Sequence, residues 1–278
     1  MKKALEYSIN FLLFSNTWVA LCMSGLITGL THYYCIEDIQ LYAIFAFTGT
    51  FAVYNFHRLI RNRTLQKQQV FTPRILWLND HRFLLMAACG VTIITAGTIF
   101  FFLPVKPVSL ILLGISGMIV VFYAVPIPYT GKSLRTIGGL KNTWIVVIWI
   151  VLLSVPLINR GKEIHYEDLT LIALFVYIQI IPFDIRDFDY DARSMKTFPQ
   201  LFGIRGSRII GTLLLAVFTG LMLVTTPVHW FLCVPIGLSL AGLWWKQSYA
   251  ANRYLELVWD GCILTLGIFY YLLPCMHS

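Results

Sequence analysis

Charged residues are scarce in this chain. They make up 12% of its 278 residues, whereas 58% are hydrophobic and the mean hydropathy is +0.74. Soluble domains carry charge on about a quarter of their residues, so this composition excludes a soluble protein. Apolar runs long enough to cross a bilayer recur along the chain, and the alternating segments of about ten residues that build a membrane barrel are missing. We therefore expect an all-α polytopic membrane helix bundle.

The sequence also lacks closely spaced cysteine pairs, linkers and a signal-peptide cleavage pattern. The six cysteines lie singly in or beside different apolar runs, with no close pair at metal-binding spacing, so we expect them to be packing residues. No linker or low-complexity segment divides the chain, and residues 1–278 are expected to form a single integral membrane domain. No signal-peptide cleavage pattern stands out, so the first apolar run is expected to remain in the protein.

A glycine-rich phosphate-binding loop is also missing. The glycines within the apolar runs are therefore expected to let helices approach one another closely. They are Gly25, Gly29, Gly114, Gly117, Gly211 and Gly220.

Nine apolar segments are candidate membrane spans. They cover approximately Ile9–Thr31, Ile39–Ile60, Phe83–Leu103, Val108–Ile127, Trp144–Ile158, Leu169–Phe183, Ile209–Val224, Trp230–Trp245 and Leu255–Leu273. With the amino terminus inside, Lys106, Arg160 and Lys162 are the only outer ones among the 21 basic residues. This excess of inner basic residues indicates a cytosolic amino terminus.

The same charge distribution bears on location and partners. The basic residues border the apolar segments and form no single patch, so nucleic acid is not an expected partner. An inner basic rim favours anionic lipid or a phosphorylated substrate. We expect a protein of the bacterial plasma membrane, with its polar site on the cytosolic side.

Four carboxylates stand at the end of the sixth apolar segment, within residues 183–191. If a helix continues through them, Asp184, Asp187 and Asp191 share one face, whereas Asp189 turns to the other side with Arg186. Three carboxylates on one stripe suit Mg²⁺, which binds through a few carboxylates and the phosphates of a substrate. The alternative is a solvated acidic loop balanced by its basic neighbours. Ionisable groups at the mouth of a membrane bundle favour the metal site.

The same stretch, Asp-Ile-Arg-Asp-Phe-Asp-Tyr-Asp at 184–191, is followed by Lys-Thr-Phe-Pro at 196–199 and Leu-Phe-Gly at 201–203. It resembles the second aspartate-rich motif of the UbiA-type membrane prenyltransferases, Asp-x-x-Asp-x-x-x-Asp followed by Lys/Arg-Thr-Leu-Pro and Leu-Gly. That family has nine membrane helices, with this motif on the cytosolic side between the sixth and the seventh. Hydropathy and charge give the stretch the same position here, and the resemblance covers nearly the whole chain.

The third inner loop supports this resemblance. Tyr123, the prolines at 126 and 128, and Lys132 look like the family's tyrosine, paired prolines and basic residue after the fourth helix. The resemblance implies that Lys132 and Arg135 contact the diphosphate, that Lys196 also binds substrate, and that Tyr123 assists at the cation or the phosphate.

The first motif of the family is altered. Where the family has Asn-Asp-x-x-Asp-x-x-x-Asp, residues 55–63 read Asn-Phe-His-Arg-Leu-Ile-Arg-Asn-Arg and carry no carboxylate. On a helix Asn55, Arg58 and Asn62 share a face, which could present cationic and amide donors to phosphate oxygens. Arginine binds phosphate bidentately and could replace part of the charge that a metal supplies. The alternative is that Arg58, Arg61 and Arg63 anchor the inner side by reaching toward lipid headgroups.

Two functions follow from the resemblance. The first is an intramembrane prenyltransferase that moves a prenyl group from a prenyl diphosphate to an aromatic or lipid acceptor, with Mg²⁺ on Asp184, Asp187 and Asp191. The second is a non-catalytic protein of the same fold that binds or carries a lipid phosphate, favoured by the loss of the first acidic motif. The acceptor, the prenyl length and the oligomeric state stay open.

Asp260 in the last segment either lines a cavity or, as we expect, pairs with Lys246 or Arg253.

Overall fold

The computed structural model describes residues 2–67, 72–189, 195–225, 230–245 and 253–274, and these are all helix, turn or loop. The helices are α1 (Lys2–Phe14), α2 (Thr17–Tyr33), α3 (Ile39–Lys67), α4 (Pro73–Asp80), α5 (Arg82–Phe102), α6 (Pro107–Ala124), η1 (Leu134–Thr136), α7 (Lys141–Arg160), α8 (Tyr166–Arg186), α9 (Phe198–Thr225), η3 (Trp230–Leu232), α10 (Cys233–Trp244) and α11 (Arg253–Leu272). The predicted all-α class is confirmed.

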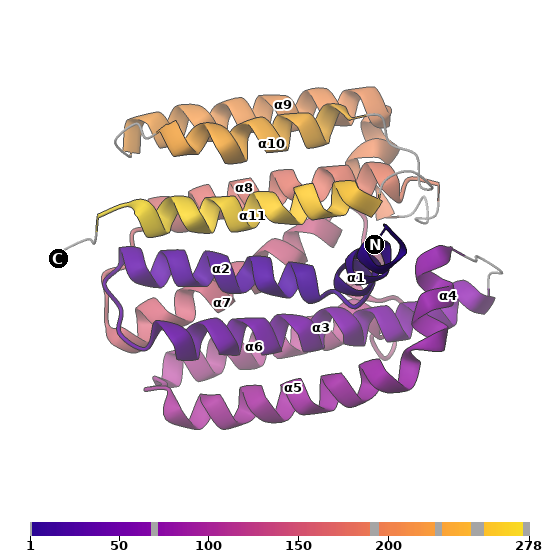
Figure 1. Ribbon diagram of the computed structural model, residues 1–278, viewed down its shortest axis with the longest axis horizontal. Coiled ribbons are helices and arrows are strands. Elements are labelled where there is room, and N and C mark those ends of the chain that lie inside the picture. The colour runs from indigo at the N-terminus through magenta and orange to yellow at the C-terminus, as the bar shows by residue number, and fades with distance from the viewer. Residues whose placement is uncertain (1, 68–71, 190–194, 226–229, 246–252, 275–278) are drawn as a thin grey trace.

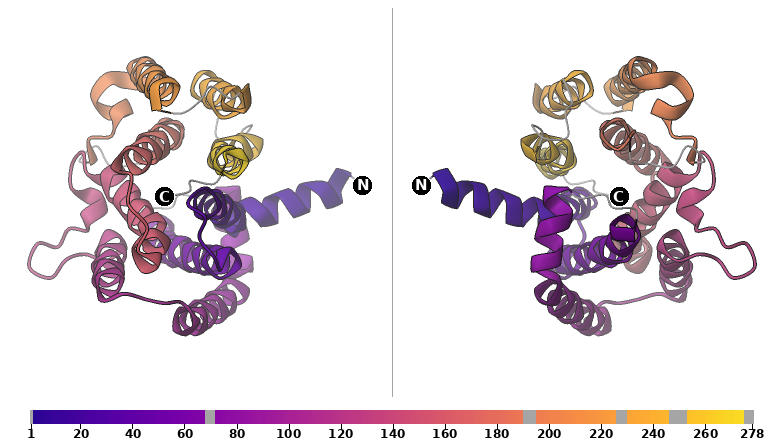
Figure 2. Two further views of the ribbon diagram at one scale, coloured as in Figure 1. Left: turned by 90° about the vertical axis from the view of Figure 1, so that its left-hand side faces the viewer. Right: turned by 90° about the vertical axis from the view of Figure 1, so that its right-hand side faces the viewer.

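The long helices run side by side along one axis, with α9 and α10 at one side of the bundle and α5 at the opposite side (Figure 1). Helix α4 crosses the others near one end, and α1 projects away from the bundle (Figure 2). Helices α2, α7, α8 and α11 lie between the two sides.

The nine predicted apolar segments are mostly helical; the first is divided between α1 and α2, and the eighth between η3 and α10. By length and composition, six of the helices in the described residues can cross a membrane, or seven if α1 and α2 are one bent span. Helix α10, with 12 residues, is too short to be counted with them. The chain is therefore an integral membrane protein, while the full number of nine spans and the cytosolic amino terminus stay predictions.

The first predicted span, Ile9–Thr31, is not continuous. Helix α1 ends at Phe14, α2 begins at Thr17, and the two axes differ in direction by 68°. Asn16 lies at the break with φ 57°, a left-handed conformation that asparagine adopts more readily than most residues. Hydropathy averaged over the segment did not reveal this break, because the three polar residues at 15–17 are flanked on both sides by long apolar runs.

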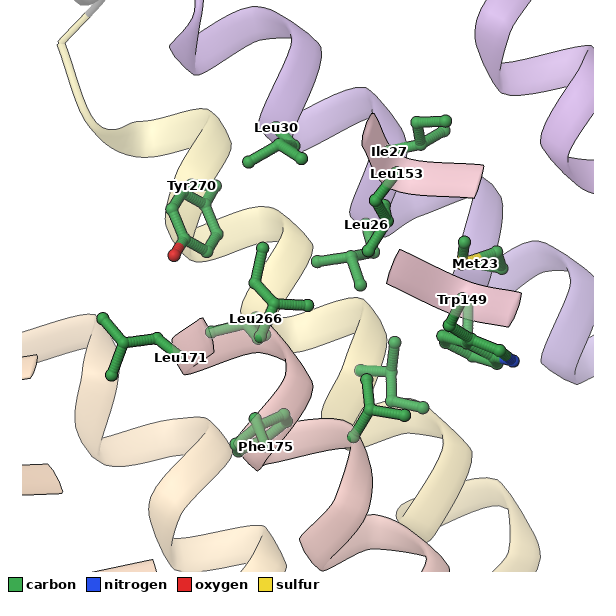
Figure 3. Packing of buried hydrophobic residues seen from close by; sticks show 14 of the residues in the cluster. Met23, Leu26, Ile27, Leu30, Trp149, Leu153, Leu171, Phe175, Leu266 and Tyr270 are labelled. Atoms are coloured by element: carbon green, nitrogen blue, oxygen red, sulfur yellow. The ribbon is translucent and has the colours of Figure 1, made fainter. Parts of the chain in front are cut away.

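The core of the bundle is formed by α2, α7, α8 and α11. Figure 3 shows Leu26 and Leu30 of α2, Leu153 of α7, Phe175 of α8 and Leu266 of α11 facing one another. All five are almost completely buried. Van der Waals packing of this kind stabilises helices in a bilayer, where lipid tails are as apolar as the side chains.

Close helix approach, expected at six glycines, occurs at some of them. A Cβ at Gly29 would overlap the carbonyl group of Gly267 on α11, and a Cβ at Gly267 would lie 2.6 Å from the carbonyl oxygen of Gly25. Helices α2 and α11 therefore touch through their backbones. Gly211 is similarly crowded by Leu243 at 2.7 Å. The expectation is wrong at the other three, where an added Cβ would meet nothing within 4 Å: Gly114, Gly117 and Gly220.

Candidate functional site

A cavity of about 210 Å³ lies within the bundle, and its lining includes Leu13 of α1 and Arg74 of α4. Its polar part is lined by ten charged side chains from α3, α4, η1, α7, α8, α11 and the turn after α8. They are Arg58, Arg61, Arg74, Arg135, Lys141, Asp184, Arg186, Asp187, Glu256 and Asp260. Its apolar part is lined by residues that include Trp18, Tyr54, Ile145, Trp149 and Ile180. One space thus joins a charged end to an aromatic and aliphatic end.

Asp184, the first carboxylate of the predicted metal stripe, is buried in the last turn of α8. Its two oxygens accept hydrogen bonds from Lys141 Nζ at 2.7 Å and from Asn142 Nδ2 at 2.6 Å. Both donors come from the first turn of α7. A buried carboxylate needs such partners, and Asp184 therefore joins α7 to α8 as well as lining the cavity.

Helix α8 ends at Arg186, so the helical stripe assumed for the three aspartates stops before Asp187. Asp187 lies in the following turn, with its backbone N–H bonded to Phe183. Arg186 Nε donates to Asp187 Oδ1 at 2.8 Å, and Arg61 NH1 lies 3.6 Å from Asp187 Oδ2. Arg186 was expected on the other face, yet it lines the same cavity. Burial alone raises the pKa of Asp187, but the guanidinium groups of Arg186 and Arg61 outweigh burial and hold that pKa well below its ordinary value.

Glu256 of α11 extends this network across the cavity. It accepts from Arg186 NH1 at 2.5 Å through one oxygen and from Arg74 NH1 at 3.0 Å through the other. Arg74 of α4 also donates to the Leu13 carbonyl at 2.7 Å and to Asn16 Oδ1 at 2.8 Å. Charge-assisted bonds therefore connect α4, α8, α11 and the break between α1 and α2.

Arg58, predicted from the altered motif to bind phosphate, reaches the cavity. Within the part of the chain that the structure describes, its side chain makes no hydrogen bond and no ion pair. The other five basic residues of the lining are Arg61, Arg74, Arg135, Lys141 and Arg186. Against these six cations stand four carboxylates, so the described lining has a formal charge of +2.

Tyr123 and Arg135 also line the cavity, while the roles that the resemblance implies for them stay predictions. The Tyr123 ring lies 5.1 Å from the His57 ring, between centroids, and His57 Nε2 lies 2.8 Å from the Val120 carbonyl oxygen. These contacts hold α3 against α6 beside the charged end.

Asn55 and Asn62 share the predicted face with Arg58 but do not line the cavity. Asn55 is completely buried, and its amide donates to the Ser15 carbonyl at 2.8 Å and the Phe51 carbonyl at 2.9 Å. It also accepts from Asn16 Nδ2 at 3.0 Å. Asn62 Nδ2 donates to Asn79 Oδ1 of α4 at 2.8 Å. Both side chains therefore hold the helices that carry the arginines.

For Asn55 we expect an effect on stability that exceeds any effect on ligand affinity. Asn55→Ala leaves the Ser15 carbonyl and the Asn16 amide without their partner, and we expect it to lower the free energy of unfolding by about 1–3 kcal/mol. The apparent melting temperature of the protein in detergent measures this loss. A variant that melts like the original protein but binds a prenyl diphosphate more weakly would assign Asn55 to the site after all.

The remaining predicted residues lie elsewhere. Lys132 is exposed in the loop before η1, away from the cavity. Lys196 is exposed beside a separate pocket of about 90 Å³, whose lining it shares with Lys141, Asn142 and Thr197. Asp191 lies outside the described residues. The roles given to these three residues stay predictions.

Sequence reasoning missed several members of the cavity lining. Arg74, Arg186 and Glu256 were not singled out for a role in the site, and Asp260 was expected to pair with Lys246 or Arg253. Lys246 and the Arg253 side chain lie outside what the structure describes, whereas Asp260 lines the cavity. The sequence does contain a signal that could have found two of these residues. Glu256 and Asp260 are four residues apart, on one face of a helix that is mostly apolar.

The described residues do not fit the predicted Mg²⁺ site. Asp184 is held by an ammonium and an amide group, and Asp187 by two guanidinium groups. Across the described ranges, no three carboxylate, histidine or cysteine side chains are grouped so that they could hold a metal. Carboxylates that are already neutralised by cations are poor ligands for a hard divalent ion.

A scan against models of protein families and a search of curated proteins find no match to this chain. Solved structures match it in fold. A digeranylgeranylglyceryl phosphate synthase in membranes gives a TM-score of 0.55 at 15% identity, over 98% of this chain and all of that chain. A UbiA homolog from Archaeoglobus fulgidus gives 0.51 at 13% identity, over 95% and 100%, and its Cd²⁺-bound form gives 0.52 with the same identity and coverage. The chain therefore has the UbiA-type membrane fold that its second motif predicted.

Proposed function

We propose that this protein transfers a prenyl group from a prenyl diphosphate to an aromatic or lipid acceptor within the membrane. The observation that carries the proposal is the two-part cavity. Its charged end has a formal charge of +2 and suits a diphosphate, while its apolar end suits a prenyl chain. The shared fold supports the same reading, because a synthase of a prenylated glyceryl phosphate has it.

The reaction divides into steps that these residues can assist. The bond between the allylic carbon and the diphosphate oxygen breaks, its electron pair leaves with the diphosphate, and an allylic cation remains. Arg58, Arg135 and Lys141 stabilise the negative charge that develops on the leaving oxygen. Tyr54 and Trp149, which line the apolar part, exclude water and face the cation with aromatic rings.

Coupling then requires loss of a proton. The acceptor donates an electron pair to the allylic carbon, a new bond forms, and the acceptor proton must leave. Asp260 lines the cavity and has no ion pair among the residues that the structure describes. It is therefore the carboxylate best suited to accept this proton.

The test is a transfer assay on the purified protein in detergent. Radiolabelled prenyl diphosphates of several lengths are supplied with a panel of aromatic and lipid acceptors, with and without magnesium. We expect diphosphate release coupled to a labelled product, and a loss of about a hundredfold or more in Asp184→Asn, because the Lys141 ammonium loses its counter-charge and its position. Asp189→Asn is the matched control, since Asp189 is exposed and five residues further along the chain.

The second candidate function is binding or carriage of a lipid phosphate without transfer. One observation favours it: residues 55–63 carry no carboxylate where the family has its first acidic motif. Tight binding of the labelled prenyl diphosphates, with no release under any pairing of donor and acceptor, would replace the transferase proposal with this one.

A further inference from the structure

The charged end of the cavity has a surplus of guanidinium donors and no free carboxylate on the α8 side. Asp184 is bonded to Lys141 and Asn142, and Asp187 to Arg186. The stretch of α3 that faces them contributes Arg58 and Arg61 in place of acids. An anion that enters this end therefore meets cationic side chains first.

Two arginines of the cavity lining, Arg58 and Arg74, have N–H donors without a hydrogen-bond acceptor among the described residues. Arg58 makes no hydrogen bond or ion pair within the described ranges, although it lines the cavity. Arg74 has a nearly buried side chain, and among the described residues its Nε has no hydrogen-bond partner. A buried N–H without a partner costs free energy, and an uncompensated guanidinium costs more. An anionic ligand that accepts these hydrogen bonds would recover that free energy.

We propose that the cavity binds the diphosphate group of its ligand directly through Arg58, assisted by Arg61 and Arg74, and that this binding needs no divalent cation. The proposal rests on the proposed function for the identity of the ligand as a prenyl diphosphate, but not for its turnover. Guanidinium groups are suited to this role because each offers a planar pair of N–H donors to two phosphate oxygens and stays charged.

Arg58 carries most of this binding because its neighbours are already engaged. Arg61 lies 3.6 Å from Asp187, and Arg74 is bonded to Glu256, Asn16 and the Leu13 carbonyl. These two arginines must share their charge between a carboxylate and the ligand. Arg58 can turn all of its donors to phosphate without breaking any contact that the structure shows.

The experiment measures binding without turnover. Geranylgeranyl thiolodiphosphate, which resists ionisation, is titrated into the detergent-solubilised protein in excess EDTA and again in millimolar magnesium. We expect the dissociation constants in EDTA and in magnesium to agree within about threefold. Arg58→Met keeps an unbranched stem but removes the guanidinium group, and we expect it to weaken binding in EDTA about tenfold to hundredfold. Arg58→Lys keeps the charge but not the paired donors, so we expect its dissociation constant in EDTA to lie between those of the original protein and Arg58→Met. Inorganic pyrophosphate, which lacks the chain, should bind more weakly and lose affinity by the same factor in Arg58→Met.

The matched control is Arg82→Met, because Arg82 is exposed at the start of α5 and does not line the cavity. Melting curves without ligand check that Arg58→Met is folded, and removal of an uncompensated cation is expected to leave its melting temperature unchanged or higher.

Binding that appears only with magnesium, or equal affinities for Arg58→Met and the original protein in EDTA, would overturn the inference. Strong binding in EDTA without transfer to any acceptor leaves the inference intact and removes the transferase proposal. Transfer to an acceptor, combined with binding that appears only with magnesium, would support the transferase proposal and overturn the inference.

Discussion

Replacing Arg186 with methionine is expected to lower the free energy of unfolding by about 3–5 kcal/mol, the usual cost of removing one partner from a buried ion pair. Arg186 bonds to Asp187 at 2.8 Å and to Glu256 at 2.5 Å, and all three side chains are at most 13% exposed. Its loss leaves two nearly buried carboxylates with one cation fewer; of the ion pairs found among the described residues, Arg61 still pairs with Asp187 and Arg74 with Glu256. The apparent melting temperature in detergent is the measurement.

A double-mutant cycle separates the ion pair from general damage to the end of α8. Arg186→Met combined with Glu256→Gln removes both charges, so the pair of changes should cost clearly less than the sum of the two single changes. Arg205→Met, at an exposed position early in α9, is the control and should leave the melting temperature unchanged. Strict additivity of Arg186→Met and Glu256→Gln would show that the contact between α8 and α11 contributes no coupling energy.

Replacing Gly29 with valine is expected to separate α2 from α11 and to cost about 3 kcal/mol or more, at the upper end of overpacking effects. Even one added carbon would overlap the Gly267 carbonyl group, which belongs to backbone and cannot turn aside as a side chain can. Close backbone approach through glycine is a common way for membrane helices to pack. Thermal unfolding in detergent and the yield of monodisperse protein report the loss.

The control for this change lies on α5. Gly97→Val introduces the same side chain where an added Cβ meets nothing within 4 Å. Glycine and valine differ in helix propensity by only a few tenths of a kcal/mol, so we expect the melting temperature of Gly97→Val to lie within about one degree of that of the original protein. Equal melting temperatures for Gly29→Val and Gly97→Val would contradict the backbone contact between α2 and α11.

Much of the fold was predictable because it depends on properties that each segment carries by itself. A span must be long and apolar in any context, and the helices found at the nine predicted segments follow from this requirement. The second aspartate-rich motif was equally local, and the fold that it implied is confirmed. The break at Asn16 escaped prediction because it depends on contacts with Asn55 and Arg74, which are distant in sequence.

The candidate site was predictable only in part. Five of the residues that their motifs singled out line the cavity: Arg58, Tyr123, Arg135, Asp184 and Asp187. Helical periodicity placed Asn55 and Asn62 on the face of Arg58, but it cannot tell which part of that face meets a neighbouring helix and which part meets open space. Both asparagines meet neighbouring segments of the chain.

By itself, the sequence determined that this protein is an all-α membrane protein, that its acidic motif stands at the end of one span, and that the facing stretch is cationic. Only the tertiary structure decided how these charges are paired. Arg74 and Glu256 are 182 residues apart and meet at 3.0 Å. Asp184 and Asp187 are held by lysine and arginine, and Arg58 is left to face the cavity. The physical reason is that local pattern fixes the face on which a side chain stands, whereas the partner that neutralises a buried charge depends on which helices pack together.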